Sequence, residues 1–590
     1  MGSGLLYLGL RSALILLGVV APALAMVRSD PEVASTSSAA AMQIVSFRFR
    51  TDTAVGLNED AGWGAPENVV PELHYDRPFR LRLQVRAIAE RALGEVAGLQ
   101  YRRSGEPWRA VGVADFPYPD FATPVVSVVS TEAYAAGAGT EPLLGGADED
   151  ESDEGQGLNA VAMTPAWNPL EDEIVEWEWP LVIRRFADGP TFSADGTVFE
   201  LRAVDGLGYP LAGSSSLQIP VTAAPRHLGG TFVETPGRLG PYQSAQGHLY
   251  FFMEPTETDN RLLAMRSVDY GLSWEEVDAE HRPVADDLEG VSSTRVGNTI
   301  HLVHQVSEEV FHHAFAIGGD EGEDQWLIDS HSIATHEEPP TQFADIAARS
   351  DGSLVVAYAG LEKLFLQSRH ADGSWGDAVR VDDDLSPSLS GPVLVAHDND
   401  VITLAYTGFD GSGFVRHLLP DNTLSPRQRL SNKLGVEDEY NGAFLPLVAI
   451  PGSGETVVIY QEEDGLLYER RFAADDVLSP PVKVSALPAV HNAVDSEQVG
   501  ADLVAYEGTL HLLFIEAASR SIYYTRSVVP GEWSEPELVI DGIEGSWVRG
   551  SIHRDDQGQL VYGFVYDAGS KGGAGMNRYH SILLGTGAAM

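Results

Sequence analysis

Hydrophobic residues recur from about residue 245 onward in short runs, each of which follows a turn. A run begins beside a Gly or Asn and continues with several mostly apolar residues, the pattern of a buried β-strand. The runs follow Gly247, Gly297, Gly352, Asn399, Gly454, Gly508 and Gly558. Their starts lie roughly 50 residues apart, which is typical of β-propeller blades with four strands each.

A second strand follows each of these runs and extends the repeat. The second strands begin at Leu262, Val310, Leu364, Gly413, Leu466, Ser521 and Asn577. The seven repeats predict a seven-bladed β-propeller over residues 226–590. The last repeat ends at Leu584, with too few residues left for an outer strand. We predict that residues 230–234 supply that strand and close the ring, because closure removes open sheet edges.

Residues 41–225 lack this period but still contain alternating strands. Residues 79–86, 175–179 and 199–202 alternate between apolar and polar side chains, as half-buried strands do, and residues 217–221 end the set. About seven strands of this kind fit an immunoglobulin-like β-sandwich. The whole chain is therefore predicted to be all-β, with a sandwich domain followed by a propeller.

An acidic stretch interrupts the predicted sandwich. Residues 145–157 contain the run DEDESDE between glycines, which predicts a mobile acidic loop. A calcium-binding loop is the alternative, but the spacing of the acids does not match an EF-hand. We predict no metal site and no cofactor.

The N-terminus has the features of a secretory signal. Residues 1–25 combine a positive charge at Arg11, a short apolar run and a cleavage site at Ala23-Leu24-Ala25. Residues 26–40 read as a flexible linker. The run is too short to span a membrane, and no later stretch qualifies. We predict a secreted or cell-surface protein, and the absence of cysteine from an exported chain favours a bacterial source.

The formal net charge of −48 limits the possible partners. It argues against nucleic acids and anionic membrane surfaces, which would repel the chain. An anionic glycan stays possible, because a local basic pocket can oppose the global field. The charge also suits a well-solvated surface, which is the simpler explanation. The oligomeric state is not predicted.

Ligand-binding residues are predicted at the mouth of the propeller channel, where loops of many blades meet. The predicted starts of the innermost strands are rich in Arg, Gln, Asn and aromatic residues, types that hydrogen-bond to sugars and stack on them. The candidate substrate-binding residues are Tyr242, Gln243, Arg295, Gln342, Asn441, Gln498, Trp547, Arg549 and Arg578. The alternative for each is that it only completes the hydrogen bonds of a strand end.

One motif gives these repeats a family resemblance. Ser267, Asp269, Gly271 and Trp274 form the pattern S-x-D-x-G-x-x-W, which resembles the Asp box of sialidases and bacterial-neuraminidase-repeat proteins. Asp turns a hairpin by binding backbone N–H groups, Gly takes the conformation that the turn needs, and Trp fills the gap between neighbouring strands. An Asp box is therefore predicted to be structural.

The resemblance implies a sialidase-like glycoside hydrolase that acts on acidic glycans. Sialidases have six blades, an R-I-P motif, three arginines that clamp a carboxylate, a Tyr–Glu nucleophile pair and an Asp acid/base. This chain has no R-I-P motif, and it has seven repeats. The six-bladed ring that the resemblance implies is therefore kept as the alternative to seven blades. Arg295, Arg549 and Arg578 are candidates for the clamp, and Tyr579 is a second candidate nucleophile. The candidate catalytic residues are Tyr440, Asp345 and Glu497.

Two other classes of function stay open beside the hydrolase. The first is a noncatalytic glycan-binding or adhesive surface protein. The second is a polysaccharide lyase, in which a His or Tyr base removes a proton while Arg neutralises a uronate. His312, His313, Tyr440 and Arg295 are the available groups, although adjacent histidines of one strand point to opposite faces. The fold alone does not rank these classes.

Overall fold

A computed structural model gives the three-dimensional structure of the chain. It describes residues 42–584 except 53–54, 89–95, 115–123, 146–151, 169, 186–195, 214, 230–236, 254–261, 278–282, 284–290, 307–308, 319–323, 336–343, 361–362, 384, 386–391, 433, 435–444, 491–499, 544–546 and 569–576. Every regular element in these ranges is a β-strand, as predicted. The predicted signal peptide (1–25) and linker (26–40) lie outside the described residues.

The N-terminal strands form two five-stranded sheets and a small hairpin. One sheet has the order β1 (Met42–Thr51), β3 (Phe79–Ala87), β10 (Ile174–Ile183), β7 (Val126–Val128) and β6 (Gly112–Val113). The other has the order β2 (Leu73–His74), β12 (Leu217–Thr222), β11 (Thr197–Asp205), β4 (Ala97–Arg103) and β5 (Arg109–Ala110). Strands β8 (Gly139–Thr140) and β9 (Gly155–Gln156) pair separately.

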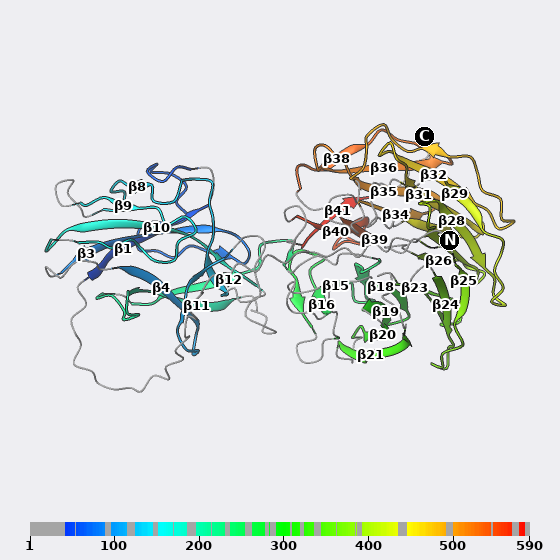
Figure 1. Ribbon diagram of the computed structural model, residues 1–590, viewed down its shortest axis with the longest axis horizontal. Coiled ribbons are helices and arrows are strands. Elements are labelled where there is room, and N and C mark those ends of the chain that lie inside the picture. The colour runs from blue at the N-terminus through cyan, green and yellow to red at the C-terminus, as the bar shows by residue number, and fades with distance from the viewer. Residues whose placement is uncertain are drawn as a thin grey trace, which may run out of the picture. The chain divides into compact units, whose positions relative to one another are not determined.

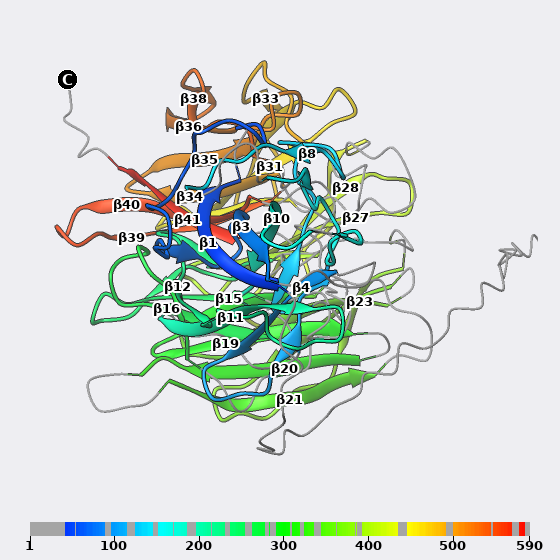
Figure 2. The same ribbon diagram turned by 90° about the vertical axis from the view of Figure 1, so that its left-hand side faces the viewer.

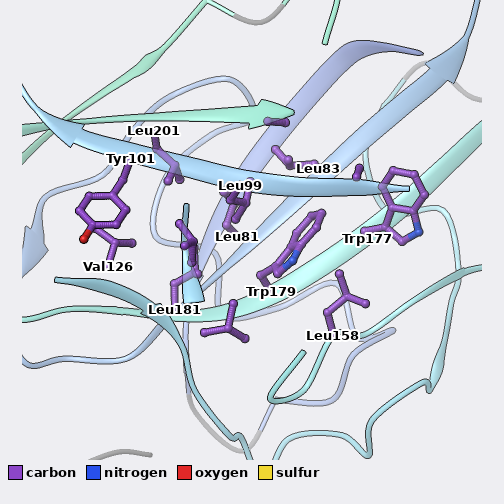
Figure 3. Close-up of a cluster of buried hydrophobic side chains, with 14 of the residues drawn as sticks. Leu81, Leu83, Leu99, Tyr101, Val126, Leu158, Trp177, Trp179, Leu181 and Leu201 are labelled. Atoms are coloured by element: carbon purple, nitrogen blue, oxygen red, sulfur yellow. The ribbon is translucent and has the colours of Figure 1, made fainter. Parts of the chain in front are cut away.

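The two sheets enclose one apolar core (Figure 3). Alternate residues of β3 and β10 face it, so that Trp177 lies opposite Leu83 and Trp179 opposite Leu81. Leu99 of β4 and Leu201 of β11 approach from the other sheet. This packing follows from the period of two in each strand, which places all apolar residues on one face.

The polar face of β3 is buried as well, which differs from the half-buried strand that the alternation predicts. Arg82 Nε donates to Glu176 Oε2 at 2.6 Å, and Arg80 Nη1 donates to Glu178 Oε1 at 3.0 Å. Loop carbonyls complete the shell, because Arg80 and Arg82 also donate to the oxygens of Val55 and Leu57. Loops held by these arginines therefore cover a face that the sequence pattern assigns to solvent.

The predicted acidic loop 145–157 is structured in its second part. Gly155 and Gln156 form β9, and Trp167 Nε1 donates to Asp153 Oδ2 at 2.8 Å. Residues 146–151, which hold most of the acidic run, lie outside the described part of the chain.

Seven consecutive antiparallel sheets follow in the described residues and form a β-propeller (Figure 1). In chain order within the repeats the strands are β14 (Tyr242–Gln243), β15 (Leu249–Met253), β16 (Leu263–Ser267) and β17 (Glu275–Glu276); β18 (Val291–Val296), β19 (Thr299–Val306), β20 (Glu309–Ala316) and β21 (Gln325–Thr335); β22 (Ala344–Ala348), β23 (Leu354–Gly360), β24 (Lys363–Arg369) and β25 (Val379–Asp382); β26 (Val393–Ala396), β27 (Ile402–Thr407), β28 (Gly413–Leu418) and β29 (Gln428–Ser431); β30 (Leu447–Ile450), β31 (Glu455–Gln461), β32 (Leu467–Phe472) and β33 (Val482–Lys483); β34 (Ala501–Tyr506), β35 (Thr509–Ile515), β36 (Ile522–Val529), β37 (Glu532–Trp533) and β38 (Glu537–Ile540); and β39 (Val548–Arg554), β40 (Leu560–Asp567) and β41 (Asn577–Leu583).

The first strand of each sheet lies innermost. Strand β18 contacts β22, and the same contact between first strands continues through β26, β30, β34 and β39 to β14. Between β14 and β18 the link is made by Tyr242, whose hydroxyl lies 2.9 Å from Ser293 Oγ. The other strands follow outward, as β19, β20 and β21 do side by side (Figure 2).

The ring closes through a strand from before the first repeat, as predicted. Strand β13 (His227–Gly229) pairs antiparallel with β41 and becomes the outer strand of the last sheet. The residues differ from the prediction, because 230–234 lie outside the described ranges and the pairing strand is three residues earlier. Closure thus joins segments more than 350 residues apart, as in the 2.8 Å contact between Arg226 Nη1 and His580 Nδ1.

Candidate functional site

The stretch from Ser267 to Trp274 folds into the tight turn that its residues predict. Ser267 Oγ donates to Asp269 Oδ1 at 2.8 Å and accepts from Gly271 N at 2.7 Å. Ser273 N donates to Asp269 Oδ1 at 2.8 Å. Burial opposes ionisation of Asp269, but these bonds prevail and lower its pKa.

This turn joins β16 to β17 and contacts a neighbouring sheet. Trp274 is buried, and its ring lies 5.8 Å from that of Tyr579 on β41. Gly271 has a φ of +91°, and a Cβ there would lie 2.2 Å from the Tyr579 ring. The motif is therefore structural, and Tyr579, the second candidate nucleophile, is a packing residue under it.

A cavity of about 340 Å³ lies in the channel between the innermost strands. Parts of β26, β30, β34 and β39 line it, together with residues 238–242. Most of its wall is aliphatic, from residues such as Val395, Leu447 and Val504. Its polar side chains are Arg238, Tyr242, Asp502, Arg549 and Ser551.

Arg238 is the cation whose side chain has the fewest protein partners in this cavity. Its backbone is fixed beside β18, because Arg238 N donates to Ser292 Oγ at 3.2 Å. Its half-buried guanidinium donates from Nη2 to the Leu447 oxygen at 3.0 Å, its single hydrogen bond among the described residues. A guanidinium carries five N–H donors, so most of the donors of Arg238 have no partner among the described residues.

Asp502 and Arg549 form the buried wall of the cavity. Asp502 Oδ2 accepts from Gly550 N at 2.9 Å and from the Tyr562 hydroxyl at 2.6 Å. Arg549 donates to the oxygens of Gly237 at 2.9 Å and Ala501 at 3.2 Å. Burial raises the pKa of Asp502, and the positive charge of Arg549 opposes that rise. Burial likewise lowers the pKa of Arg549 to about 10, against the attraction of Asp502.

Asp345, a candidate catalytic residue, links sheets at the equivalent place on β22. Its Oδ2 accepts from Leu394 N of the next sheet at 2.6 Å, and Ser292 of the previous sheet donates to its Oδ1. Burial raises its pKa, although Arg238 and these bonds oppose the rise. It does not line the cavity, and its bonds to Ser292 and Leu394 join three neighbouring sheets.

The predicted binding residues Tyr242, Gln243 and Arg295 lie around the β14–β18 corner. Tyr242 lines the cavity, and burial raises its pKa to about 12. Gln243 exchanges hydrogen bonds with the backbone of Arg554 at 2.8 and 3.0 Å. Arg295 Nε donates to the Gly297 oxygen at 2.6 Å, and its Nη1 donates to the Gln243 oxygen.

The three candidate arginines do not form a clamp. Arg549 is the second residue of β39, whereas Arg295 is the fifth of β18, and each donates to its own set of carbonyl oxygens. Arg578 lies on β41, two strands away from the channel. Trp547 is fully buried and stacks on Phe251 at 6.2 Å, so its ring does not offer a platform for a sugar. Tyr440, Asn441, Glu497, Gln498 and Gln342 lie outside the described residues.

One described tyrosine bonds to an acid of the cavity wall, and the candidate lyase bases lie elsewhere. Tyr562 donates to Asp502, but burial and this carboxylate raise its pKa well above the ordinary value. His312 and His313, the candidate lyase bases, are buried within the sheet on β20. Burial lowers the pKa of His312 to about 2 and that of His313 well below its usual value. Neither histidine reaches the channel cavity.

Neither a metal-binding cluster nor a membrane-spanning helix is found in the described ranges. No group of three or more His, Cys, Asp or Glu side chains in these ranges is placed to hold a metal ion. No helix in the same ranges is long and apolar enough to cross a membrane.

Arg238, Asp502 and Ser551 line the cavity but are not among the residues predicted from the sequence. A signal for Asp502 was present, because Ala501-Asp502-Leu503 repeats Ala344-Asp345-Ile346 at the same place in another repeat. Arg238 has no such signal, since it precedes the first recognisable strand and enters the channel only when the ring has closed.

The chain is thus all-β in its described residues, with a β-propeller whose channel holds a mostly aliphatic cavity that carries a few polar side chains. No protein-family model matches the chain. No curated protein matches it either.

Solved structures give only distant similarity. The chain is 9% identical to the SapL1 lectin solved with alpha methyl fucoside, covering 52% of this chain and 97% of the lectin with a TM-score of 0.36. It is 9% identical to the six-bladed β-propeller lectin of Aleuria aurantia. That match covers 51% of this chain and 92% of the lectin, with a TM-score of 0.34. The chain is also 10% identical to BBS1N, solved in complex with ARL6DN. That match covers 61% of this chain and 95% of BBS1N, with a TM-score of 0.38.

Proposed function

We propose that this protein is a glycan-binding protein whose sugar ligand occupies the channel cavity and is held by Arg238. The guanidinium of Arg238 supports this proposal most, since only one of its hydrogen bonds goes to a described protein group. A volume of about 340 Å³ is enough for one or two sugar units, and it falls in the lower part of the range of about 300–1,000 Å³ for ligand sites.

The neighbouring groups suit sugar hydroxyls. Ser551 and Tyr242 contribute hydroxyl groups, and Asp502 contributes a carboxylate on the same wall. The aliphatic strands beside them match the C–H faces of a sugar ring. Arg238 can also pair with a carboxylate on an acidic sugar, despite the acidic charge of the whole chain.

Binding is favoured over sialidase-like hydrolysis because the described part of the site lacks the expected machinery. Arg295, Arg549 and Arg578 do not converge, and Asp345 is held between sheets by Leu394 and Ser292. Hydrolysis would depend on Tyr440 and Glu497.

The proposal includes a cellular setting and a complete architecture. The chain is secreted or displayed on a cell surface through residues 1–25. The seven sheets are the full set of propeller blades, and the preceding sandwich is of the immunoglobulin type. In this setting the ligand is a polysaccharide or glycoconjugate outside the cell.

A glycan array followed by titration calorimetry tests the proposal, with Arg238→Gln as the key variant. The variant keeps the size of the side chain but removes its charge and most donors, so it should weaken binding about 10- to 100-fold. Arg526→Gln is the control, because Arg526 is exposed on β36.

Three outcomes count against the proposal. They are equal affinities of wild type and Arg238→Gln, loss of affinity in Arg526→Gln to the same extent, and no binding on a panel of neutral and acidic glycans. Release of free sialic acid from a bound glycoconjugate would show that the protein is a hydrolase and not only a binding protein.

A further inference from the structure

The channel is crossed at one end by residues that precede the first repeat. Residues 237–241, the crossing segment, lie where the innermost strands begin. Gly237 N donates to the oxygen of Val291, the first residue of β18, at 2.9 Å. Arg549 Nε of β39 donates to the Gly237 oxygen at 2.9 Å. The crossing segment is therefore held between the second and the last sheet of the propeller.

The side chain of Arg238 carries this crossing to the other side of the ring. Its backbone N donates to Ser292 Oγ on β18 at 3.2 Å, whereas its Nη2 donates to the oxygen of Leu447, the first residue of β30, at 3.0 Å. Two whole sheets lie between β18 and β30 along the chain. Backbone and side chain together thus span the channel, so a glycan chain is not expected to pass through it.

The exposure of the innermost strands rises toward their other end. Strands β18 and β34 each begin with three buried residues and end with three partly exposed ones. Strand β30 has one buried residue followed by three partly exposed ones, and β39 ends at the exposed Arg554. The cavity therefore opens where the innermost strands end. This open end is opposite to the end at which the sequence predicts ligand binding.

The accessible wall of the cavity lies toward the open end. Val504 and Ala505 of β34 line the cavity and are partly exposed, as are Ser551 and Ile552 of β39. A ligand that enters here meets these side chains first and reaches Arg238 last. The site is thus a blind channel with a cation at its closed end.

The rim of the open end has an apolar arc and a polar arc. Four consecutive sheets carry an alanine at the last or second-last position of the innermost strand, namely Ala348, Ala396, Ala449 and Ala505. The other three sheets are neighbours in the closed ring, and they carry Arg554, Gln243 and Arg295 there. The rim is therefore polar and cationic on one side only.

Hydrogen bonds join the polar arc into one unit. Arg295 Nη1 donates to the Gln243 oxygen, and Gln243 exchanges hydrogen bonds with the backbone of Arg554 at 2.8 and 3.0 Å. Arg554 Nη1 also donates to the Gly558 oxygen at 2.7 Å. Two cations are thus fixed at the rim of a chain whose formal net charge is −48.

Two carboxylates beside this arc accept hydrogen bonds from their own turns. Asp555 Oδ1 accepts from Gln557 N at 3.0 Å and from Gln559 N at 2.7 Å. Glu507 Oε1 accepts from the Tyr506 hydroxyl at 3.0 Å. These bonds hold both carboxylates in their turns, so the arginines are the groups of the rim that suit an anionic ligand.

On the basis of the proposed function, we propose that the ligand is the end of an acidic oligosaccharide, a chain of uronate units, which enters at the open end. The terminal carboxylate pairs with Arg238, and carboxylates of the following units meet Arg295 and Arg554 at the rim. From Arg549 to Arg554, β39 advances by about 16 Å at roughly 3.3 Å per residue, which leaves room for several sugar units.

Titration calorimetry of the full chain tests the charge of the ligand. The probes are trimers of galacturonate, mannuronate and guluronate, each beside its methyl ester. At least one acidic trimer should bind, and its ester should bind about 10- to 100-fold more weakly, because esterification removes the charge. Equal affinities for acid and ester overturn this inference. Binding of a neutral glycan but of no acidic trimer overturns it too and leaves the proposed function in place, whereas binding of no glycan removes both.

The rim is tested by Arg295→Gln and Arg554→Gln. Each variant should bind the trimer about two- to fivefold more weakly, because exposed ion pairs are modest in energy. Each should bind the single uronate like wild type, since one unit reaches only Arg238. Arg526→Gln is the control and should change neither. An unchanged affinity for the trimer, or an equal loss for monomer and trimer, contradicts the contact at the rim.

The direction of entry is tested by Ala505→Phe. The larger side chain narrows the open end and should abolish binding of the trimer. Ala518→Phe makes the same change at an exposed position in the turn from β35 to β36, at the other end of the same sheet, and should bind like wild type. If Ala505→Phe does not fold, Ala396→Phe on β26 takes its place. Loss of binding in Ala518→Phe, or none in the variant at the open end, overturns entry from this side.

The stoichiometry with a long polymer tests recognition of the chain end. The probe is the polymer of the uronate whose trimer binds. A blind channel should hold one protein per polymer chain, because the two ends of a glycan differ chemically. Several proteins bound along one chain would show that internal units are recognised, and would overturn the inference.

Discussion

Gly271 shows how a single residue connects a local turn with the packing between sheets. Its φ of +91° is required by the turn that Ser267 and Asp269 stabilise. Its missing side chain also leaves space for the ring of Tyr579 on another sheet. The first requirement follows from the motif in the sequence, and the second arises only in the folded ring.

Substituting Gly271 should reveal both requirements separately. Gly271→Ala introduces backbone strain and a clash with Tyr579, and should lower the free energy of unfolding by about 2–4 kcal/mol. Gly508→Ala is the control, because its φ is +79° and no atom lies within 4 Å of an added Cβ. It should cost only the strain, about 1–2 kcal/mol. Chemical denaturation measures both, and equal losses would contradict a packing role for Gly271.

The sheet of β18 to β21 is distinguished by buried histidines. Four of them occupy its second and third strands, namely His301, His304, His312 and His313. His301 Nδ1 lies 3.1 Å from His312 Nε2, and the rings of His304 and His313 are 6.0 Å apart. Burial lowers all four pKa values, to about 4 for His301 and about 3 for His304. These side chains are therefore neutral packing groups in the folded protein.

Such histidines should make this sheet sensitive to acid. His304 takes up a proton near pH 6.5 when unfolded but only near pH 3 when folded, so acid favours unfolding between these values. Replacing it by Leu removes this contribution. As the pH is lowered from 7.5 to 5, wild type should lose this contribution and the variant should not. The free energy of unfolding of His304→Leu minus that of wild type should therefore increase by about 2 kcal/mol.

Urea denaturation at the two pH values measures this change. The comparison with wild type cancels the effects of other groups, including Asp345 and Asp502, whose raised pKa values act in the opposite direction. His370→Leu, at an exposed position on the surface, should change little at either pH. A difference for His304→Leu that is the same at both pH values would show that His304 does not contribute in this way.

At the scale of the whole molecule, the propeller depends on closing its ring with a segment from before its first repeat. Strand β13 completes the last sheet, and Leu228 in this strand is fully buried in the core beside Tyr579 and Phe251. The turn between β16 and β17 contributes too, because Arg226 N donates to the Leu272 oxygen at 2.7 Å and Tyr579 N donates to the Arg226 oxygen at 2.8 Å. Closure therefore combines strand pairing, a turn and a shared core.

Weakening this closure should loosen the last sheet first. Leu228→Ala leaves a cavity between β13 and its neighbours and should cost about 2–5 kcal/mol. Hydrogen exchange should then speed up in β13 and β41 before it changes in the N-terminal sandwich. Leu419→Ala, at an exposed Leu, is the control and should stay within about 0.5 kcal/mol. Uniform acceleration over the chain, or none in β41, would contradict this picture of closure.

The sequence by itself determined the features that depend on neighbours along the chain. Alternation within each strand, glycine at each turn and the repeat of roughly 50 residues predicted the all-β class, the order of strands and the tight turn from Ser267 to Trp274. These are local because a strand's faces and a turn's geometry are set within a few residues.

Only the tertiary structure decided which side chains meet. It buried Trp547, Asp345 and the arginines of β3, and it brought Arg238 to Asp502 in the channel although their order in the chain gives no sign of it. Closing a ring and packing two sheets bring together residues that are hundreds of positions apart in the chain. Burial then determines whether a polar side chain binds the backbone or remains accessible to a ligand.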